Sequence, residues 1–174
     1  LAATPVGHLP FPLYQQAEIN LLLTGSGAVK AGTAVSLWLS HYLRDLGLAH
    51  GAGLLAPPLV VANFGTAGAD ARAYEIGQTL LVHRVQDELG PSLYPERLVP
   101  WDGVEGECRT VARPRTKSDE KARLYDMEAF AISEATATFL STSHLVVGKC
   151  VSDHLGEPLD WKALAQRCQN AYRQ

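Results

Sequence analysis

The sequence lacks the cysteine patterns that mark disulfide-rich proteins and many metal proteins. Its three cysteines are Cys108, Cys150 and Cys168, and no pair has the spacing of a Cys-x-x-Cys motif or a zinc knuckle. A reducing, cytoplasmic setting is the simplest expectation. Cys150 lies inside an apolar run and Cys168 on the expected inner face of the last helix, so both are interpreted as small buried hydrophobic side chains.

Long apolar runs are also missing. No stretch of 18 or more apolar residues is present, and Leu1–Pro5 has neither a basic segment nor a long apolar segment. The sequence therefore indicates neither a membrane span nor a secretion signal. It begins without Met, which is expected if the N-terminus has been processed or trimmed.

Excess positive charge is absent as well. The formal net charge is −3, so no basic field favours nucleic acid or an anionic membrane surface as a partner. The densest basic cluster consists of Arg109, Arg113, Arg115 and Lys117, followed by Asp119 and Glu120. We interpret this cluster as a solvated loop, with a phosphate or partner contact as the alternative.

What is present fits one compact domain that covers residues 1–174. The chain has 47% hydrophobic and 19% charged residues, a composition that supports a sizeable core and does not resemble that of a disordered protein. Neither an internal repeat nor a low-complexity segment is found.

The first half of the chain alternates between strand-like and helix-like patterns. Leu1–Ala3 is a candidate first strand, and Ile19–Leu23 has the length and composition of a strand. The turn Thr24–Gly27 follows, and apolar residues then recur at helical spacing from about Val29 to Leu46, with Gly47 as the expected C-cap. A further strand, Leu59–Ala62, is expected to end in the glycine-containing turn Asn63–Gly68.

The second half repeats this alternation. Strands are expected at Ile76–Val85, Glu107–Val111 and His144–Val151, a long connection at Gln86–Pro100, and helix starts at Ser118–Glu120 and Met127. Pro158 suits the first turn of a last helix whose apolar stripe is Trp161, Leu164, Ala165, Cys168 and Tyr172. The sum is a layered α/β fold.

Three acids are placed where the expected sheet meets its helices. Asp126 and Glu128 lie two residues apart, and Asp153 follows an apolar strand, where a parallel strand would deliver it to the carboxyl edge of the sheet. Open α/β sheets bind ligands at that edge. The placement therefore predicts a ligand site. The alternatives are that Asp126 caps a helix, that Glu128 is an acid at a helix start, and that Ser152-Asp153 caps a turn.

Two glycine-containing turns are candidates for binding a ligand. The backbone N–H groups of Gly25-Ser26-Gly27 can face an anion at the start of a helix, or the segment can be a plain turn. It has neither the Lys-Ser/Thr of a Walker A loop nor the third glycine of a dinucleotide fingerprint. Gly65-Thr66-Ala67-Gly68 allows a flat ligand to approach the backbone, and Thr66 adds a hydroxyl.

The pair Met127-Glu128 suits a sugar. A carboxylate can accept hydrogen bonds from two vicinal hydroxyls, and a thioether offers a polarizable apolar surface to the face of a sugar ring. The alternative is that Met127 belongs to the core.

The order of these segments resembles the nucleoside phosphorylase/nucleosidase superfamily, especially its methylthioadenosine/S-adenosylhomocysteine and futalosine nucleosidase branches. The resemblance rests on Asn63–Gly68, then Asp126-Met127-Glu128, then Val151-Ser152-Asp153, and it runs from about Ile19 to Val151 and beyond. Thr24–Gly27 and Gly77–Leu80 are in register with it, and Asp87–Pro95 is closer to the futalosine-type branch. It implies a three-layer αβα fold with a central, mostly parallel or mixed sheet (phosphorylase/hydrolase-like).

The resemblance also implies roles for individual residues. Asp153 would be the general acid at N7 of the departing purine, with Ser152 orienting it, and Glu128 would bind the ribose hydroxyls while Met127 packs on the sugar. The remaining predicted ligand-binding residues are Thr66, Ala67 and Gly68, which would line the pocket, and Lys149, near the ribose or phosphate. The strand at Thr110-Val111 would neighbour the base, and no aromatic residue matches the expected stacking position there.

These roles agree with the chemistry of N-glycosidic cleavage. The sugar develops oxocarbenium character and the base negative charge, so an acid should protonate the leaving group and a carboxylate should stabilise the sugar. For Asp153 to carry a proton near neutral pH, its pKa must be raised, which burial at a strand end would do.

One departure from the family concerns the attacking water. Nucleosidases of this group have a glutamate soon after the first strand, whereas Pro5–Leu9 contains no acid and the first acid is Glu18. Either His8 or Glu18 takes the place of that glutamate, or residues are missing near this point, or the protein hydrolyses its substrate inefficiently. Phosphorolysis has less support because Lys30 is the only basic residue near the first glycine turn.

The resemblance thus implies an enzyme that hydrolyses a purine nucleoside, expected to be 5′-modified, with no metal and no cofactor. It also implies a homodimer or larger homo-oligomer. The alternatives are a nucleoside phosphorylase and a nucleoside-binding module that has lost water activation. A dinucleotide-binding domain is disfavoured because no Gly-x-Gly-x-x-Gly motif occurs.

Overall fold

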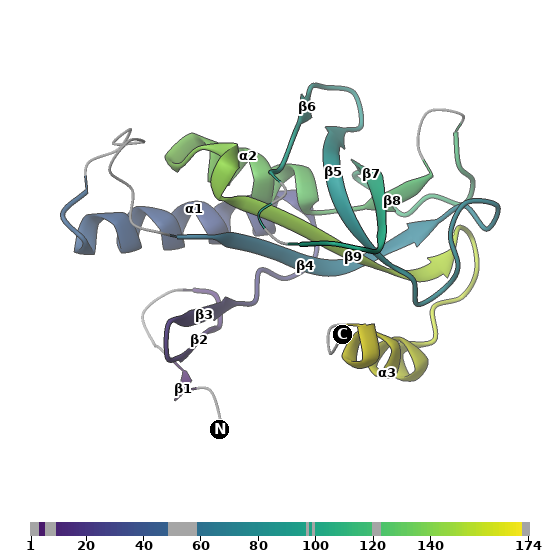
Figure 1. The fold of residues 1–174 in the computed structure, drawn as a ribbon, viewed down its shortest axis with the longest axis horizontal. Coiled ribbons are helices and arrows are strands. Elements are labelled where there is room, and N and C mark those ends of the chain that lie inside the picture. Colours follow the sequence, from purple (N-terminus) through teal and green to yellow (C-terminus); the bar gives the residue numbers. More distant parts are fainter. Residues whose placement is uncertain are drawn as a thin grey trace.

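The computed structural model describes residues 4–5, 10–48, 59–96, 98, 100–119 and 123–171 (Figure 1). The expected strand at Leu1–Ala3, His8 and Tyr172 lie outside the described residues, as do the side chains of Trp161 and Cys168.

The described elements include most of the expected strands and helices, together with short strands that the sequence did not indicate. They are β1 (Thr4–Pro5), β2 (Leu13–Gln16), β3 (Ile19–Leu22), α1 (Ala28–Asp45), β4 (Val61–Ala69), β5 (Thr79–Asp87), β6 (Ser92–Leu93), β7 (Val104–Thr110), β8 (Leu124–Asp126), α2 (Ala129–Phe139), a 3₁₀ turn at Thr142–His144, β9 (Leu145–His154) and α3 (Trp161–Ala171).

A mixed sheet forms the centre of the fold. Its strands lie in the order β6-β5-β7-β8-β4-β9, and β5 also pairs with β9, so the sheet closes on itself. The pairs β4–β9, β5–β7 and β7–β8 are parallel, whereas β4–β8 and β5–β9 are antiparallel. Strands β1, β2 and β3 form a separate antiparallel sheet.

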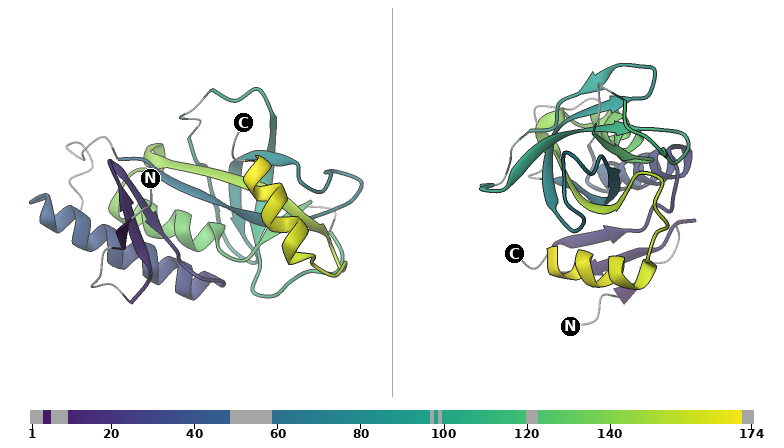
Figure 2. Two further views of the ribbon diagram at one scale, coloured as in Figure 1. Left: turned by 90° about the horizontal axis from the view of Figure 1, so that it is seen from below. Right: turned by 90° about the vertical axis from the view of Figure 1, so that its right-hand side faces the viewer.

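Helices flank the central sheet on different sides. Helices α1 and α2 pack against each other through buried residues that include Leu39 and Ile132. Figures 1 and 2 show α3 and the β1–β3 sheet on the side of β4 and β9 opposite α2. This arrangement confirms the predicted three-layer αβα fold class with a mixed sheet. Within the described part of the chain, no helix is long and apolar enough to cross a membrane.

The core of the central sheet comes from its inward-facing strand residues. Leu80, Val82, Val147 and Val151 are almost wholly buried there, and Cys108 and Cys150 are buried as well, which confirms the interpretation of Cys150. Burial of such apolar surface is the main contribution to stability.

The structure corrects the predicted end of the strand before the glycines. Residues Asn63–Gly68 are not a turn, because β4 continues to Ala69 in parallel pairing with β9, with a register shift between Ala67 and Gly68. Strand β9 likewise continues to His154, so Asp153 lies inside the strand.

Two predicted helix starts are wrong. Ser118 begins no helix, because its hydroxyl donates instead to the carboxylate of Asp70 and Asp119 forms an isolated β-bridge. The last helix begins at Trp161 rather than at Pro158, because Asp160 Oδ1 accepts hydrogen bonds from the N–H groups of Lys162 and Ala163 and so caps the helix.

The first helix ends as the sequence predicts. Gly47 has φ 71°, and its N–H donates to the carbonyl of Arg44, while the N–H of Leu48 donates to that of Leu43. This pair of bonds is a Schellman motif, in which glycine takes the left-handed position without a Cβ clash.

Candidate active site

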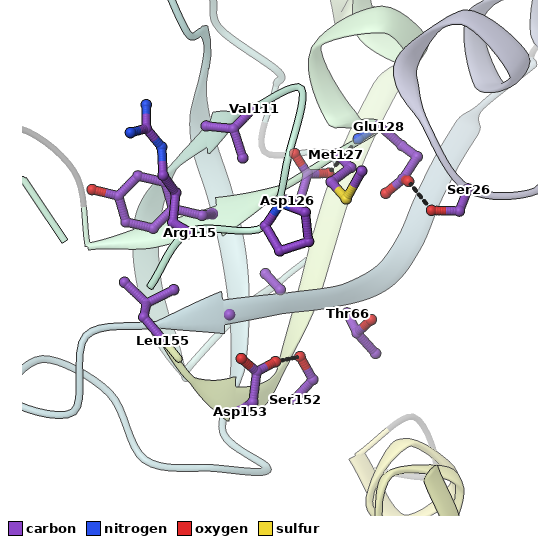
Figure 3. A pocket seen from close by; sticks show the side chains of 14 residues that line it. Ser26, Thr66, Val111, Arg115, Asp126, Met127, Glu128, Ser152, Asp153 and Leu155 are labelled. Atoms are coloured by element: carbon purple, nitrogen blue, oxygen red, sulfur yellow. Dashed lines mark hydrogen bonds between the residues drawn. The ribbon is translucent and has the colours of Figure 1, made fainter. Parts of the chain in front are cut away.

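A pocket of about 190 Å³ opens where β4 and β9 approach the start of α2 (Figure 3). The side chains and backbone that line it are Ser26, Thr66, Ala67, Gly68, Val111, Pro114, Arg115, Tyr125, Asp126, Met127, Glu128, Ser152, Asp153 and Leu155. All the predicted site residues are therefore brought together here except Lys149.

Asp153 reaches the pocket because β9 pairs in register with the glycine-containing part of β4. Gly68 is the residue opposite Asp153, and a Cβ at Gly68 would lie 3.2 Å from Oδ2 of Asp153 and 3.0 Å from Cδ2 of Leu155. The hydroxyl of Ser152 donates to Oδ1 of Asp153 at 2.5 Å. The glycine thus leaves room for a half-buried carboxylate that Ser152 orients.

Glu128 stands at the junction of two helices. Its Oε1 accepts hydrogen bonds from the N–H of Gly27 at 2.6 Å and from the hydroxyl of Ser26 at 3.1 Å. Gly27 directly precedes α1, so the carboxylate lies at the positive end of that helix. The Thr24–Gly27 turn is therefore an anion site that a side chain of the same chain occupies.

Asp126 is buried behind Glu128 and holds the start of α2. Its Oδ2 accepts hydrogen bonds from the N–H of Ala129 at 2.7 Å and of Glu128 at 3.3 Å, and its Oδ1 accepts one from the hydroxyl of Thr110 at 2.7 Å. These bonds satisfy donors that a helix start leaves open. Asp126 therefore holds the start of α2 through its side chain, as local structure, although the N-cap residue itself is Glu128.

Lys149 does not line the pocket. Its side chain is almost wholly buried, and its Nζ pairs with Oδ2 of Asp126 at 2.8 Å. A Cβ at Gly65 would lie 3.2 Å from this Nζ, so the glycine makes space for the ammonium group. Burial is the largest single effect and lowers the pKa of Lys149. The charge and hydrogen bond of Asp126, together with Cys108 and Glu128, more than offset it, so the pKa is raised and the group stays protonated.

The opposite wall of the pocket comes from the segment after β7 and from β8. Val111, Pro114 and Arg115 belong to the former, and Arg115 forms an ion pair with Glu88. Tyr125 lies in β8 and its hydroxyl accepts a hydrogen bond from the N–H of Asp119 at 2.8 Å.

Sequence reasoning placed the strand at Thr110-Val111 near the site but missed Tyr125 and Arg115. The one signal in the sequence for a role of Tyr125 in the site is its position next to Asp126. The solvated-loop interpretation is wrong for Arg109, which is buried in β7 and bonded to Asp119 and Gln86, whereas Arg113, Arg115 and Lys117 are exposed.

The acid expected from the N-terminal region is not found at the pocket. Glu18 is exposed in the turn between β2 and β3 and does not line the cavity. Among the described residues, the carboxylates that line the pocket are those of Asp126, Glu128 and Asp153. In the same part of the chain, no group of three or more His, Cys, Asp or Glu side chains is arranged to hold a metal ion.

Solved structures share this fold, although no family model and no curated protein sequence matches the chain. A methylthioadenosine/S-adenosylhomocysteine nucleosidase from Neisseria meningitidis, in complex with methylthio-immucillin-A, aligns with a TM-score of 0.69 and 16% identity over 98% of this chain and 84% of its own. The same kind of enzyme from Colwellia psychrerythraea, in complex with adenine, aligns with a TM-score of 0.67 and 15% identity over 98% and 79%.

A uridine phosphorylase, isoform 2 from Schistosoma mansoni, is similar as well. It aligns with a TM-score of 0.68 and 14% identity over 99% of this chain and 73% of its own. The chain therefore shares its fold with these two nucleosidases and with this phosphorylase. The fold by itself does not distinguish the two kinds of enzyme.

Proposed function

We propose that this protein is a nucleosidase that cleaves the N-glycosidic bond of a purine nucleoside with water. One observation carries the proposal: Glu128 and Asp153, which come from different elements, line the same pocket together with Met127 and Gly68 (Figure 3). Two carboxyl groups in different surroundings can take the two roles that glycosidic cleavage needs. The adenine and methylthio-immucillin-A held by neighbours of the same fold favour a purine nucleoside as substrate.

Asp153 is the acid in this proposal. As the bond between the base and C1′ breaks, the electrons move onto the purine, and Asp153 donates a proton or a hydrogen bond at N7. Ser152 holds one oxygen of the carboxyl group, and Gly68 leaves space beside the other. Asp153 is thus oriented before the base binds.

Glu128 and Met127 hold the sugar. Oε1 of Glu128 is taken by Gly27 and Ser26, whereas Oε2 accepts none of the hydrogen bonds found within the described part of the chain. Oε2 can therefore accept from the ribose hydroxyls, and the negative charge stabilises the oxocarbenium character of the sugar. Met127 gives the sugar an apolar contact.

The position of Glu128 favours water over phosphate as the nucleophile. A phosphate at the Thr24–Gly27 turn would compete with the carboxylate that already accepts the Gly27 N–H, and the two anions would repel each other. Lys30, which passes 3.8 Å from the position of a Cβ on Gly25, is the basic side chain next to this turn. Hydrolysis is therefore the reaction that we propose, and phosphorolysis is the alternative outcome.

A second candidate is a nucleoside-binding module without efficient turnover. It is favoured by one observation, the exposed position of Glu18 away from the pocket, which removes the described N-terminal acid from water activation.

A cytoplasmic location and a homodimer or larger assembly complete the proposal of a nucleosidase.

The experiment is incubation with methylthioadenosine, futalosine and inosine, with and without phosphate, followed by chromatography of free base and sugar product. We expect base release without phosphate and a free sugar as the second product. A sugar phosphate formed only in phosphate buffer would show phosphorolysis instead. Tight nucleoside binding without base release would identify the binding module.

A further inference from the structure

Three strands of the central sheet contribute a buried polar network beneath the pocket. Thr110 from β7, Asp126 from β8 and Lys149 from β9 are each exposed by no more than 4%. Asp126 links them, because it accepts from the Thr110 hydroxyl at 2.7 Å and pairs with the Lys149 ammonium at 2.8 Å. The network holds a charged pair deep inside the closed sheet.

The network ends at the first turn of α2. Asp126 accepts hydrogen bonds from the N–H groups of Glu128 and Ala129, and Oγ1 of Thr110 accepts one from the N–H of Phe130 at 2.8 Å. Three successive backbone donors are thus fixed by side chains of two strands. Side chains of β7 and β8 thus hold the backbone at Glu128 in place through hydrogen bonds.

The side chain of Glu128 is anchored from the other direction. Gly27 and Ser26, at the start of α1, bond its Oε1. The direction of its carboxylate therefore depends on two supports, the α1 start and the buried Asp126. Movement of either support turns Glu128 away from the sugar position.

Lys149 supplies the positive charge that the buried Asp126 requires. Removing one partner of a buried ion pair leaves the other as an uncompensated buried charge, which must take a proton or move. The ammonium also lies close enough to Glu128 for the charge of Glu128 to raise the pKa of Lys149. Gly65 fixes the space in which Nζ sits.

We propose that Lys149 is a positioning residue: by neutralising Asp126 it fixes the first turn of α2, and thereby aims the Glu128 carboxylate at the ribose. This positioning role differs from the direct contact with ribose or phosphate that the sequence resemblance implies for Lys149. The ribose part rests on the proposed function, whereas the effect on the first turn of α2 does not.

The test compares Lys149→Met with Lys162→Met, the same substitution at an exposed site on α3. Amide hydrogen exchange would be measured at Gly27 and Ala129, together with affinities for methylthioadenosine and for free adenine. In Lys149→Met we expect faster exchange at both amides, nucleoside affinity reduced about 10-fold or more, and adenine affinity within about twofold of that of the wild type. Lys162→Met should change none of these.

Two variants give the same test by other routes. Gly65→Ala keeps every charged group but pushes on Nζ, so it should reproduce the effects in weaker form even if Lys149→Met does not fold. Asp126→Asn removes the other half of the pair. If Lys149 acts through Asp126, the variant that carries both substitutions should lose less nucleoside affinity than the product of the two single fold-losses.

The outcomes separate the two proposals. Unchanged exchange at Gly27 and Ala129, equal losses of nucleoside and adenine affinity, or fully multiplicative losses in the double variant would each overturn the positioning role. If the wild type binds neither methylthioadenosine nor adenine, the proposed function fails, and the exchange rates alone still decide whether Lys149 fixes the start of α2.

Discussion

The backbone N–H of Gly27 donates a 2.6 Å hydrogen bond to Oε1 of Glu128, which joins the start of α1 to the start of α2. The bond places a carboxylate where the dipole of α1 is positive. Oε1 of Glu128 thus occupies the anion position at the first glycine turn, and Oε2 is left to serve the sugar. The predictions below follow from this site and its supports.

Glu128→Gln should weaken both substrate binding and turnover. Gln cannot supply the negative charge that the sugar needs, and hydrogen bonds to charged groups contribute about 1.5–3 kcal/mol, so kcat/KM should fall about 10- to 100-fold. Steady-state kinetics would measure this. Glu134→Gln, at an exposed position of the same helix, is the control and should leave kcat/KM unchanged. Equal kinetics for the two variants would remove Glu128 from the mechanism.

Asp153→Asn should abolish turnover and leave nucleoside binding largely intact. An amide does not transfer the proton that the leaving base needs, and loss of a general acid lowers rates by about 10²- to 10⁴-fold. Calorimetric binding beside a base-release assay would separate the two effects. Asp45→Asn, on the exposed face of α1, is the matched control. An unaltered rate in Asp153→Asn would contradict the role of the acid.

Gly68→Ala should impair catalysis more than stability. The added methyl would press on Oδ2 of Asp153 and on Leu155 and displace the carboxylate by tenths of an ångström, so kcat should fall about 10-fold. Gly32→Ala, which meets Ala131 at 3.4 Å outside the pocket, is the control. Similar thermal midpoints with different kcat values are expected. A wild-type kcat in Gly68→Ala would show that Asp153 tolerates the shift.

Protonation of Asp70 should make the free energy of unfolding depend on pH in the acid range. Hydrogen bonds from Arg72 and Ser118 hold the pKa of its carboxyl well below the usual range. The folded protein then binds fewer protons than the unfolded chain, so this contribution is present above about pH 4 and is lost as the pH falls toward the folded pKa.

The measurement for Asp70 is urea unfolding of the wild type and Asp70→Asn between pH 7 and pH 2. The difference between their midpoints should be constant at neutral pH and shrink below about pH 4. Asp102→Asn, which removes an exposed carboxyl, is the control. A difference that grows on acidification would have the wrong sign for this account.

Local patterns predicted much of the fold. The apolar periodicity of α1, its Gly47 cap, α2, and the strands around β5, β7 and β9 are encoded by neighbouring residues and are found in place. The joint order of Gly65–Gly68, Met127-Glu128 and Ser152-Asp153 also predicted which segments meet at one pocket.

Long-range contacts were not predictable in the same way. The glycines of β4 suggested a turn, but their role is to admit Lys149 and Asp153 from β9, a relation that only strand pairing reveals. Burial of Arg109 likewise goes with hydrogen bonds to Asp119 and to Gln86 of β5, which are distant along the chain. A residue type and its neighbours do not encode such pairings.

The central claim is that the pocket cleaves a nucleoside by water with Asp153 as the acid. The most direct measurement is the initial rate of free adenine release from methylthioadenosine in phosphate-free buffer, for the wild type and for Asp153→Asn in parallel. The account predicts steady release by the wild type and a loss of about 10²-fold or more in the variant. Equal rates, or release by the wild type only after phosphate is added, would contradict it.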